Sequence, residues 1–289
     1  MTAAPVIGRF APSPTGPLHL GSLVAAVGSW LDARAQGGRW LLRIEDIDPP
    51  REHPGAADSF LPDLERHGLT WDGDVLWQHT RLPAYQEALQ QLRATGQVYA
   101  CQCSRRELLQ AGVPDCLGPC RDGRHEHGAW RLRSPATPVT VEDRRLGTWQ
   151  ERLQDSCGDI VLWRRDGLPS YQLAVVVDDA ASHITDVVRG ADLLDNTARQ
   201  CWLQHCLGAP QPRYLHLPLV IGADARKLSK QSHAPALAPD RAAANMAFAL
   251  GALGLAGHAD PQAPPGEQLQ AVLPHWRPDR LPTQPVPAL

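Results

Sequence analysis

Apolar positions along the chain recur with two spacings, and these predict strands alternating with helices. Residues 6–10 predict a short buried strand, and apolar residues three to four positions apart from Leu20 to Leu31 predict a helix directly after it. A second apolar strand is predicted at residues 40–44. Strands and helices that alternate in this way indicate an α/β fold with a parallel sheet.

Further along, the pattern changes twice. Helical spacing predicts two packing helices at residues 56–69 and 84–96. Alternating stretches rich in arginine follow from residue 130, and together with residues 169–179 they fit a small β-containing insertion between two halves of a sheet. The remaining predicted elements are a helix at 198–206, a strand at 214–221, an alanine-rich helix at 241–255 and a short helix at 267–273.

The segment between the first strand and the first helix, residues 9–22, has the composition of an anion-binding loop. Three prolines and a glycine break the backbone before the helix begins. A helix that starts after a tight loop presents backbone N–H groups and the positive end of its dipole to an anion. His19 and Ser22 lie where the helix starts and can donate to a phosphate there. A proline-rich turn with a helix cap is the alternative interpretation.

Lysine usage gives a second indication of phosphate chemistry. The chain has 28 Lys plus Arg, yet its only lysines are Lys227 and Lys230. An ammonium group is a compact point charge that suits contact with a phosphate oxygen, whereas an ordinary surface is served as well by arginine. The alternative is a chance pair in an exposed loop.

Acidic residues follow the second predicted strand. Glu45 and Asp46 stand at its carboxyl end, where open α/β sheets bind ligands. An acidic turn before Pro49 is the alternative interpretation.

Four cysteines form two close pairs. Cys101 and Cys103 are separated from Cys116 and Cys120 by twelve residues, a spacing that suits tetrahedral Zn²⁺. Four thiolates would make a closed, structural site with one Zn²⁺ per chain. Free thiols are the alternative, and the other nearby candidate ligands are Asp115, His125 and His127.

Composition limits the class of protein. A hydrophobic content of 43% with 20% charged residues is ordinary for a globular protein, and no apolar run is long enough to cross a membrane. The N-terminus lacks the pattern of a signal peptide, so we expect a cytoplasmic protein without a membrane partner. The net charge of −3 argues against a general nucleic-acid coat, and seven cysteines in such a compartment favour metal or free thiols over disulfides.

Taken together, these segments resemble class I aminoacyl-tRNA synthetases of the glutamyl type. Residues 12–22 resemble their HIGH-region signature, and residues 227–231 resemble their KMSKS loop. Ser22 replaces a second histidine, and Gln231 replaces a final serine. The resemblance implies a Rossmann-type parallel sheet with an inserted zinc-containing α/β subdomain. The expected parts are the first half of a nucleotide-binding domain (1–98), the inserted subdomain (99–178), the second half with the lysine loop (179–235) and a short helical, Pro-rich C-terminal segment (236–289).

The resemblance also implies roles for individual residues. Glu45 would hold the α-amino group of L-glutamate, and Arg9 would pair with a carboxylate of the same substrate. Mg²⁺ would accompany ATP. The implied glutamate-binding residues are Arg9, Ala11, Ser13, Glu45, Tyr171 and Arg189; the ATP-binding residues are His19, Gly21, Ser22 and Lys230; and the catalytic residues are His19, Lys227 and Lys230.

Residues 236–289 are too few for a second domain of ~100 residues. We therefore expect no anticodon-binding domain. We also expect the protein to be a monomer. Within the family, a stand-alone catalytic half is typical of enzymes that activate glutamate and attach it to queuosine in the anticodon loop of tRNA(Asp). The alternatives are a truncated enzyme that charges the 3′ end of tRNA(Glu) or tRNA(Gln), and a non-catalytic zinc-containing RNA-binding paralogue.

Replacing Lys230 with Ala should lower glutamate-dependent pyrophosphate exchange on the order of 10²-fold, the scale expected for losing one preorganised charge contact. The reason is that this ammonium would neutralise charge that grows on the leaving pyrophosphate. Unchanged exchange would remove the lysine loop from the mechanism.

Overall fold

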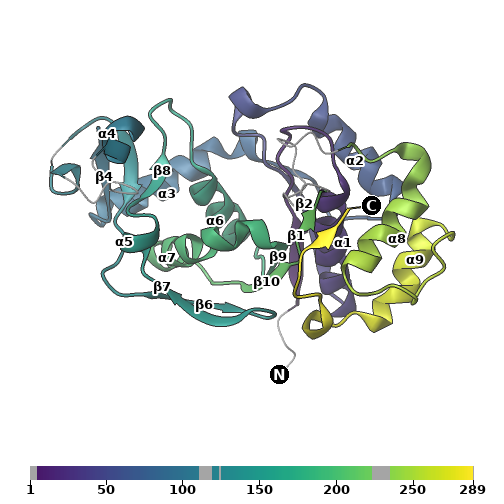
Figure 1. Cartoon of the computed structure of the whole chain (residues 1–289). Helices are drawn as coiled ribbons and strands as arrows, with labels where there is room; N and C mark the ends of the chain where they lie inside the picture. Colours follow the sequence, from purple (N-terminus) through teal and green to yellow (C-terminus); the bar gives the residue numbers. More distant parts are fainter. Residues whose placement is uncertain (1–4, 111–118, 124, 223–234, 289) are drawn as a thin grey trace.

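The central sheet has the strand order of a doubly wound fold. The computed structural model describes residues 5–110, 119–123, 125–222 and 235–288 (Figure 1). Pairing is parallel within β3-β2-β1 and within β9-β10, and the backbone N–H of Thr185 donates to the carbonyl of Ile7 at 2.9 Å, which places β9 beside β1. The resulting order is β3-β2-β1-β9-β10. The chain adds strands to one side of β1 first and then, from β9 onward, to its other side, and folds of this kind bind ligands at the point between β1 and β9 where that change occurs. The strands are β1 (Ile7–Phe10), β2 (Arg39–Ile44), β3 (Leu76–Trp77), β9 (Asp186–Gly190) and β10 (Arg213–Leu217).

Helices cover both faces of this sheet and make one apolar core on each side (Figure 1). On one face α1 packs against β1 and β9 and is itself covered by α8. A Cβ on Gly28 of α1 would lie 2.5 Å from a methyl group of Leu217, so glycine allows the helix to approach β10 closely. These elements confirm the α/β fold class. The helices are α1 (Leu20–Ala35), α2 (Ala56–Arg66), α8 (Ala242–Ala252) and α9 (Pro265–Val272) around one core, and α3 (Leu82–Ala94), α6 (Tyr171–Ala181) and α7 (Thr197–Leu207) around the other.

The inserted region contains its own antiparallel sheet, β4-β5-β8, at the far end of the molecule from α8 and α9 (Figure 1). The hairpin β6-β7 of this region does not belong to that sheet: β6 adds to the edge of the central sheet beside β10. The insertion is therefore joined to the central sheet through backbone pairing. Its elements are β4 (Val98–Cys101), α4 (Arg105–Gln110), β5 (Ala129–Leu132), β6 (Val139–Asp143), β7 (Gly147–Glu151), α5 (Leu153–Ser156) and β8 (Ile160–Trp163).

Two predicted elements differ from the structure. Residues 169–179 were grouped with the alternating stretches of the insertion, but residues 171–181 form helix α6. Ser170 caps this helix by accepting from the N–H of Leu173 at 3.4 Å, and a short apolar run fits a strand and a buried helix equally well. The predicted strand at 214–221 is broken at Pro218: β10 ends before it, and β11 (Val220–Ile221) pairs with β12 (Val286–Pro287) near the chain's end.

The C-terminal segment packs against α1. Its predicted short helix is confirmed as α9, and the indole N–H of Trp276 donates to Asp32 Oδ1 at 3.0 Å. Among the described residues, no helix has the length and apolar character needed to span a bilayer.

Asp32 is a charged residue buried inside α1 that ties three segments together. Besides Trp276, both Nη groups of Arg144 donate to its carboxylate, at 2.6 and 2.9 Å. Arg144 belongs to the turn of the β6-β7 hairpin, so one carboxylate joins the hairpin and the C-terminal segment to α1. A buried carboxylate with this many donors is costly to remove because its partners remain desolvated.

Replacing Asp32 with Ala should lower the free energy of unfolding by about 3 kcal/mol, because Arg144 loses both hydrogen bonds to this carboxylate and keeps the longer contact with Asp186, and the indole N–H of Trp276 loses its acceptor. Urea unfolding followed by circular dichroism measures the change. Asp166→Ala, which removes an exposed partner of Arg164, is the control and should cost less than about 1 kcal/mol. Equal losses in the two variants would contradict a special role for Asp32.

Candidate active site

A cavity of about 440 Å³ opens where the sheet order reverses. Its walls come from the segments that follow the carboxyl ends of β1, β2, β9 and β10, and from the start of α1 and α6. The structure therefore brings together residues spread over more than two hundred positions. Of the predicted site residues it contains Arg9, Ala11, Ser13, His19, Gly21, Ser22, Glu45, Tyr171 and Arg189. Lys227 and Lys230 lie outside the described residues.

His19 is the N-cap of α1. Its Nδ1 accepts from the backbone N–H of Ser22 at 3.3 Å, and the hydroxyl of Ser22 accepts from the backbone N–H of His19 at 3.5 Å. This reciprocal pair is a capping box, in which the imidazole takes the place usually held by a serine or threonine. Because Nδ1 is an acceptor, neutral His19 carries its proton on Nε2. The helix cap and the predicted phosphate contact are therefore compatible, since they use different nitrogens of one ring.

Two arginines on neighbouring strands share one buried carboxylate. Asp179, from the end of α6, accepts from Arg9 Nε at 3.2 Å and Nη2 at 3.3 Å, and from Arg43 Nη1 at 2.5 Å. Burial opposes ionisation of Asp179, but these two guanidinium groups hold its pKa below the ordinary value. The sequence predicted that Arg9 pairs with a substrate carboxylate. In the structure the Nε–Nη2 edge of Arg9 is occupied by Asp179.

Glu45 continues this chain of charges into the cavity. Its Oε1 accepts from Arg43 Nη2 at 3.2 Å, and its Oε2 accepts from the hydroxyl of Ser13 at 3.3 Å. Burial raises the pKa of Glu45, and the charges of Arg43 and Arg9 partly offset that rise. A cationic ligand at Glu45 would favour the ionised form further.

Arg189 lines the same cavity from β9, the strand beside β1, and is 4% exposed. Its Nη1 donates to Gln200 Oε1 at 2.7 Å, and its Nη2 donates to Thr197 Oγ1 at 2.9 Å. Its Nε donates to His216 Nε2 at 3.2 Å. All three of these partners are neutral acceptors, so none of them balances the positive charge of Arg189.

Tyr171 is the first residue of α6 and lines the same cavity. Burial, and then the negative charge of Glu45, raise the pKa of its hydroxyl. The hydroxyl is therefore protonated at neutral pH and available as a donor.

The supporting residues were not predicted from the sequence. Arg43 and Asp179 hold Arg9 and Glu45, and His216 holds Arg189. Each is a buried polar residue in a strand or helix that packs against the core, where a charge without a partner would be costly. A polar residue inside a predicted apolar run could have marked these positions, but the sequence does not show which residue each one pairs with.

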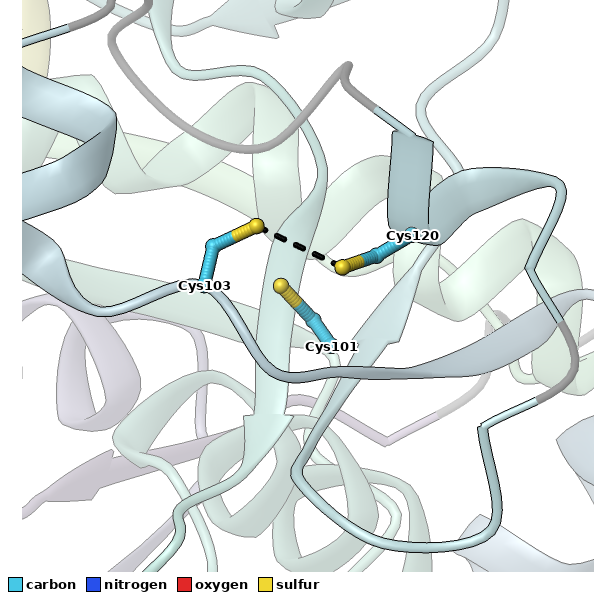
Figure 2. Close-up of side chains that lie close together, drawn as sticks. All are labelled: Cys101, Cys103 and Cys120. Carbon is cyan, nitrogen blue, oxygen red and sulfur yellow. Dashed lines mark hydrogen bonds between the residues drawn. The ribbon is translucent and has the colours of Figure 1, made fainter.

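Three of the four predicted metal ligands converge in the inserted region. The sulfur atoms of Cys101, Cys103 and Cys120 lie within 4.8 Å of one another, and Figure 2 shows the thiols turned toward a common point. Burial opposes ionisation of Cys120, yet hydrogen bonds from the backbone N–H groups of Gln102 and Cys103 hold its pKa below the ordinary value. Three converging thiols can hold a metal ion. The predicted fourth ligand, Cys116, lies outside the described residues.

Comparison with known proteins agrees with this geometry. A family model described as the catalytic domain of class I tRNA synthetases (E and Q) matches residues 5–112 and 122–240. The chain belongs to this family. The family is one of ligases, which confirms the predicted enzyme class.

Relatives of similar length carry one name. The chain is 52% identical over 281 residues to a protein of Pseudomonas putida named glutamyl-Q tRNA(Asp) synthetase, a match that covers 95% of this chain and 94% of the relative. Proteins of the same name from Thiobacillus denitrificans (51% identical, 100% of this chain and 99% of the relative) and Pseudomonas aeruginosa (52%, 96% and 95%) match equally well.

Solved structures of this synthetase family share the fold. A glutamate tRNA ligase from Elizabethkingia meningosepticum, in complex with its amino acid, superposes with a TM-score of 0.77 at 23% identity, over 98% of this chain and 67% of that chain. Glutamate-tRNA synthetase from Elizabethkingia anophelis gives 0.78 at 23% identity, over 99% and 68%.

Replacing Cys103 with Ser should abolish stoichiometric zinc, because a serine hydroxyl is a far weaker ligand than a thiolate. Elemental analysis of protein purified without chelators measures this. Cys157→Ser, at a buried thiol remote from the cluster in sequence, is the control and should keep its zinc. Wild-type protein without zinc would contradict the predicted site.

Proposed function

We propose that this protein activates L-glutamate with ATP and transfers the glutamate to queuosine in the anticodon loop of tRNA(Asp). The observation that carries the proposal is 51–52% identity over nearly the whole chain to proteins named glutamyl-Q tRNA(Asp) synthetase. The cavity supports it, since its charged groups complement an amino acid that has one amino group and two carboxylates.

The charges that line the cavity favour one orientation of glutamate. The ammonium group belongs against Glu45, the buried carboxylate of the cavity. A carboxylate belongs against Arg189, whose partners are neutral, and the Nη1 of Arg9 and the hydroxyl of Tyr171 supply further donors. These contacts would discriminate strongly, because an analogue lacking a matching group leaves a buried charge unpaired.

The first step is an in-line displacement at phosphorus. A carboxylate oxygen of glutamate attacks the α-phosphorus of ATP, the bond to the bridging oxygen breaks, and pyrophosphate leaves with that electron pair. Such a step depends on positioning and charge stabilisation more than on an acid or base. His19 and the N-terminus of α1 line the cavity and would donate to a phosphate there, and Lys227 and Lys230 would neutralise the leaving group.

In the second step a hydroxyl of the modified nucleoside attacks the carbonyl carbon of the adenylate. The carbon–oxygen bond to AMP breaks, AMP leaves as an anion, and the hydroxyl proton is released to solvent. Mg²⁺ bound with ATP would lower the repulsion between phosphates and substrate carboxylate.

The cysteine cluster would serve a separate, structural purpose. Cys101, Cys103 and Cys120, with Cys116, would bind one Zn²⁺ as a closed tetrahedral site. The metal would join β4 to the loop before β5, and so fix the inserted region that leads from the central sheet.

Charging with labelled glutamate followed by nuclease mapping tests the proposal. Label should appear in an anticodon-loop fragment of tRNA(Asp), and only when that tRNA carries queuosine. Label in a 3′-terminal fragment would instead show a tRNA-charging enzyme, and no adenylate formation at all would show a paralogue without catalysis.

A further inference from the structure

We infer that Asp143 and His216 form a relay that positions Arg189 and thereby sets the affinity for glutamate. The inference rests on the proposed function, in which Arg189 binds a substrate carboxylate. Neither residue lines the cavity, so both are positioning residues.

Asp143 ends β6, at the tip of the hairpin that joins the central sheet. Its Oδ1 accepts from the backbone N–H groups of Arg145 at 2.9 Å and Leu146 at 2.8 Å. Its Oδ2 accepts from the backbone N–H of His216 at 3.0 Å and from His216 Nδ1 at 2.7 Å. Four donors around one carboxylate fix its orientation, and with it the ring of His216.

His216 passes that orientation on to Arg189. Because its Nδ1 donates to Asp143, the neutral ring carries no proton on Nε2, which is therefore an acceptor. Arg189 Nε donates to this nitrogen at 3.2 Å, and Thr197 Oγ1 lies 3.2 Å from it. The ring is 0% exposed and stacks on Tyr214, so it has little freedom to adopt another rotamer.

The tip of the hairpin is itself held in place. Arg145 donates through Nε to the carbonyl of His216 at 2.6 Å and through Nη1 to the carbonyl of Pro282 at 2.8 Å. Arg144 is bound to Asp32 of α1 and lies 3.3 Å from Asp186. The relay therefore connects the inserted hairpin to the guanidinium of the cavity through three consecutive hydrogen-bonded groups.

Protonation of His216 would break the relay. An imidazolium would point an N–H and a positive charge at Arg189 Nε, where an acceptor is required. The other charged groups that face the ring are Asp143, which favours the imidazolium, and Arg145, which opposes it. Burial, the charge of Arg189 and that of Arg145 together hold the pKa of His216 below its ordinary value, against the pull of Asp143. Glutamate affinity should thus be constant at neutral pH and fall as the pH drops through this lowered pKa.

Two variants test the relay by glutamate-dependent ATP–pyrophosphate exchange at saturating ATP and at saturating glutamate. In Asp143→Asn, an NH₂ group must face either the N–H groups of His216 or those of the turn, so one of the two sets of hydrogen bonds that orient the ring is lost. We expect the KM for glutamate to rise about tenfold or more and the KM for ATP to stay unchanged. His216→Gln keeps an oxygen acceptor that does not titrate, so it should retain more affinity than Asp143→Asn. The part of the acidic fall in glutamate affinity that is due to His216 should disappear, which leaves only the part due to protonation of Glu45.

Asp159→Asn is the matched control. Asp159 is also a buried carboxylate; it accepts from the backbone N–H of Ser134 at 2.7 Å and pairs with Arg121 in the inserted region, and it neither lines the cavity nor contacts the relay. This variant should lower the melting temperature and leave the KM for glutamate unchanged. A merely structural role for Asp143 predicts the same behaviour for both Asp→Asn variants.

The outcomes separate the inference from the proposed function. An unaltered KM for glutamate in Asp143→Asn, or an acidic limb that is identical in the wild type and in His216→Gln, overturns the relay alone. Absence of glutamate-dependent exchange in the wild type overturns the proposed function and the relay with it. If Asp143→Asn does not fold, the pH profiles of the wild type and His216→Gln decide the matter.

Discussion

The site depends on how three buried guanidinium groups are neutralised. Arg9 and Arg43 share the carboxylate of Asp179, and Arg43 also holds Glu45. Arg189 instead donates to neutral groups. One of them is the imidazole of His216, and the carboxylate of Asp143 contacts that imidazole and not Arg189 itself. Buried charges must be compensated. As a result, the charges of Arg9, Arg43, Asp179 and Glu45 balance one another, whereas the charge of Arg189 favours an incoming anion.

The topology makes this arrangement possible. The reversal of strand order between β1 and β9 opens a crevice at their carboxyl ends, and α1 begins at the same crevice. The hairpin β6-β7 leaves the inserted region and pairs with β10 through β6, which brings Asp143 into contact with His216, the partner of Arg189. The hairpin β6-β7 thus supports Arg189 through the sheet, although none of its described residues lines the cavity.

Local patterns in the sequence predicted most of the elements and singled out His19, Ser22 and Glu45, whereas the resemblance to glutamyl-type synthetases implied the other site residues that line the cavity. Prolines before Leu20 marked the loop, and Glu45 was placed by its position at a strand end. The pairs that hold the site could not be predicted, because Arg9 and Asp179 are joined only by the fold. Helix α6 was misassigned because its apolar run has no periodicity that separates helix from strand. Cysteine spacing did predict the converging thiols, since both thiols of one pair must approach a ligand together.

The central claim is that Arg9 and Arg43, which pair with Asp179, keep their partner when substrate binds, whereas Arg189 binds a carboxylate of the substrate. A crystal structure with a non-hydrolysable glutamyl-adenylate analogue tests it most directly. The account predicts the amino group of the analogue at Glu45, a carboxylate or carbonyl oxygen of its glutamyl part at Arg189, and the Arg9–Asp179 pair intact. A structure in which Arg9 leaves Asp179 to bind the analogue while Arg189 contacts no part of it would contradict the account.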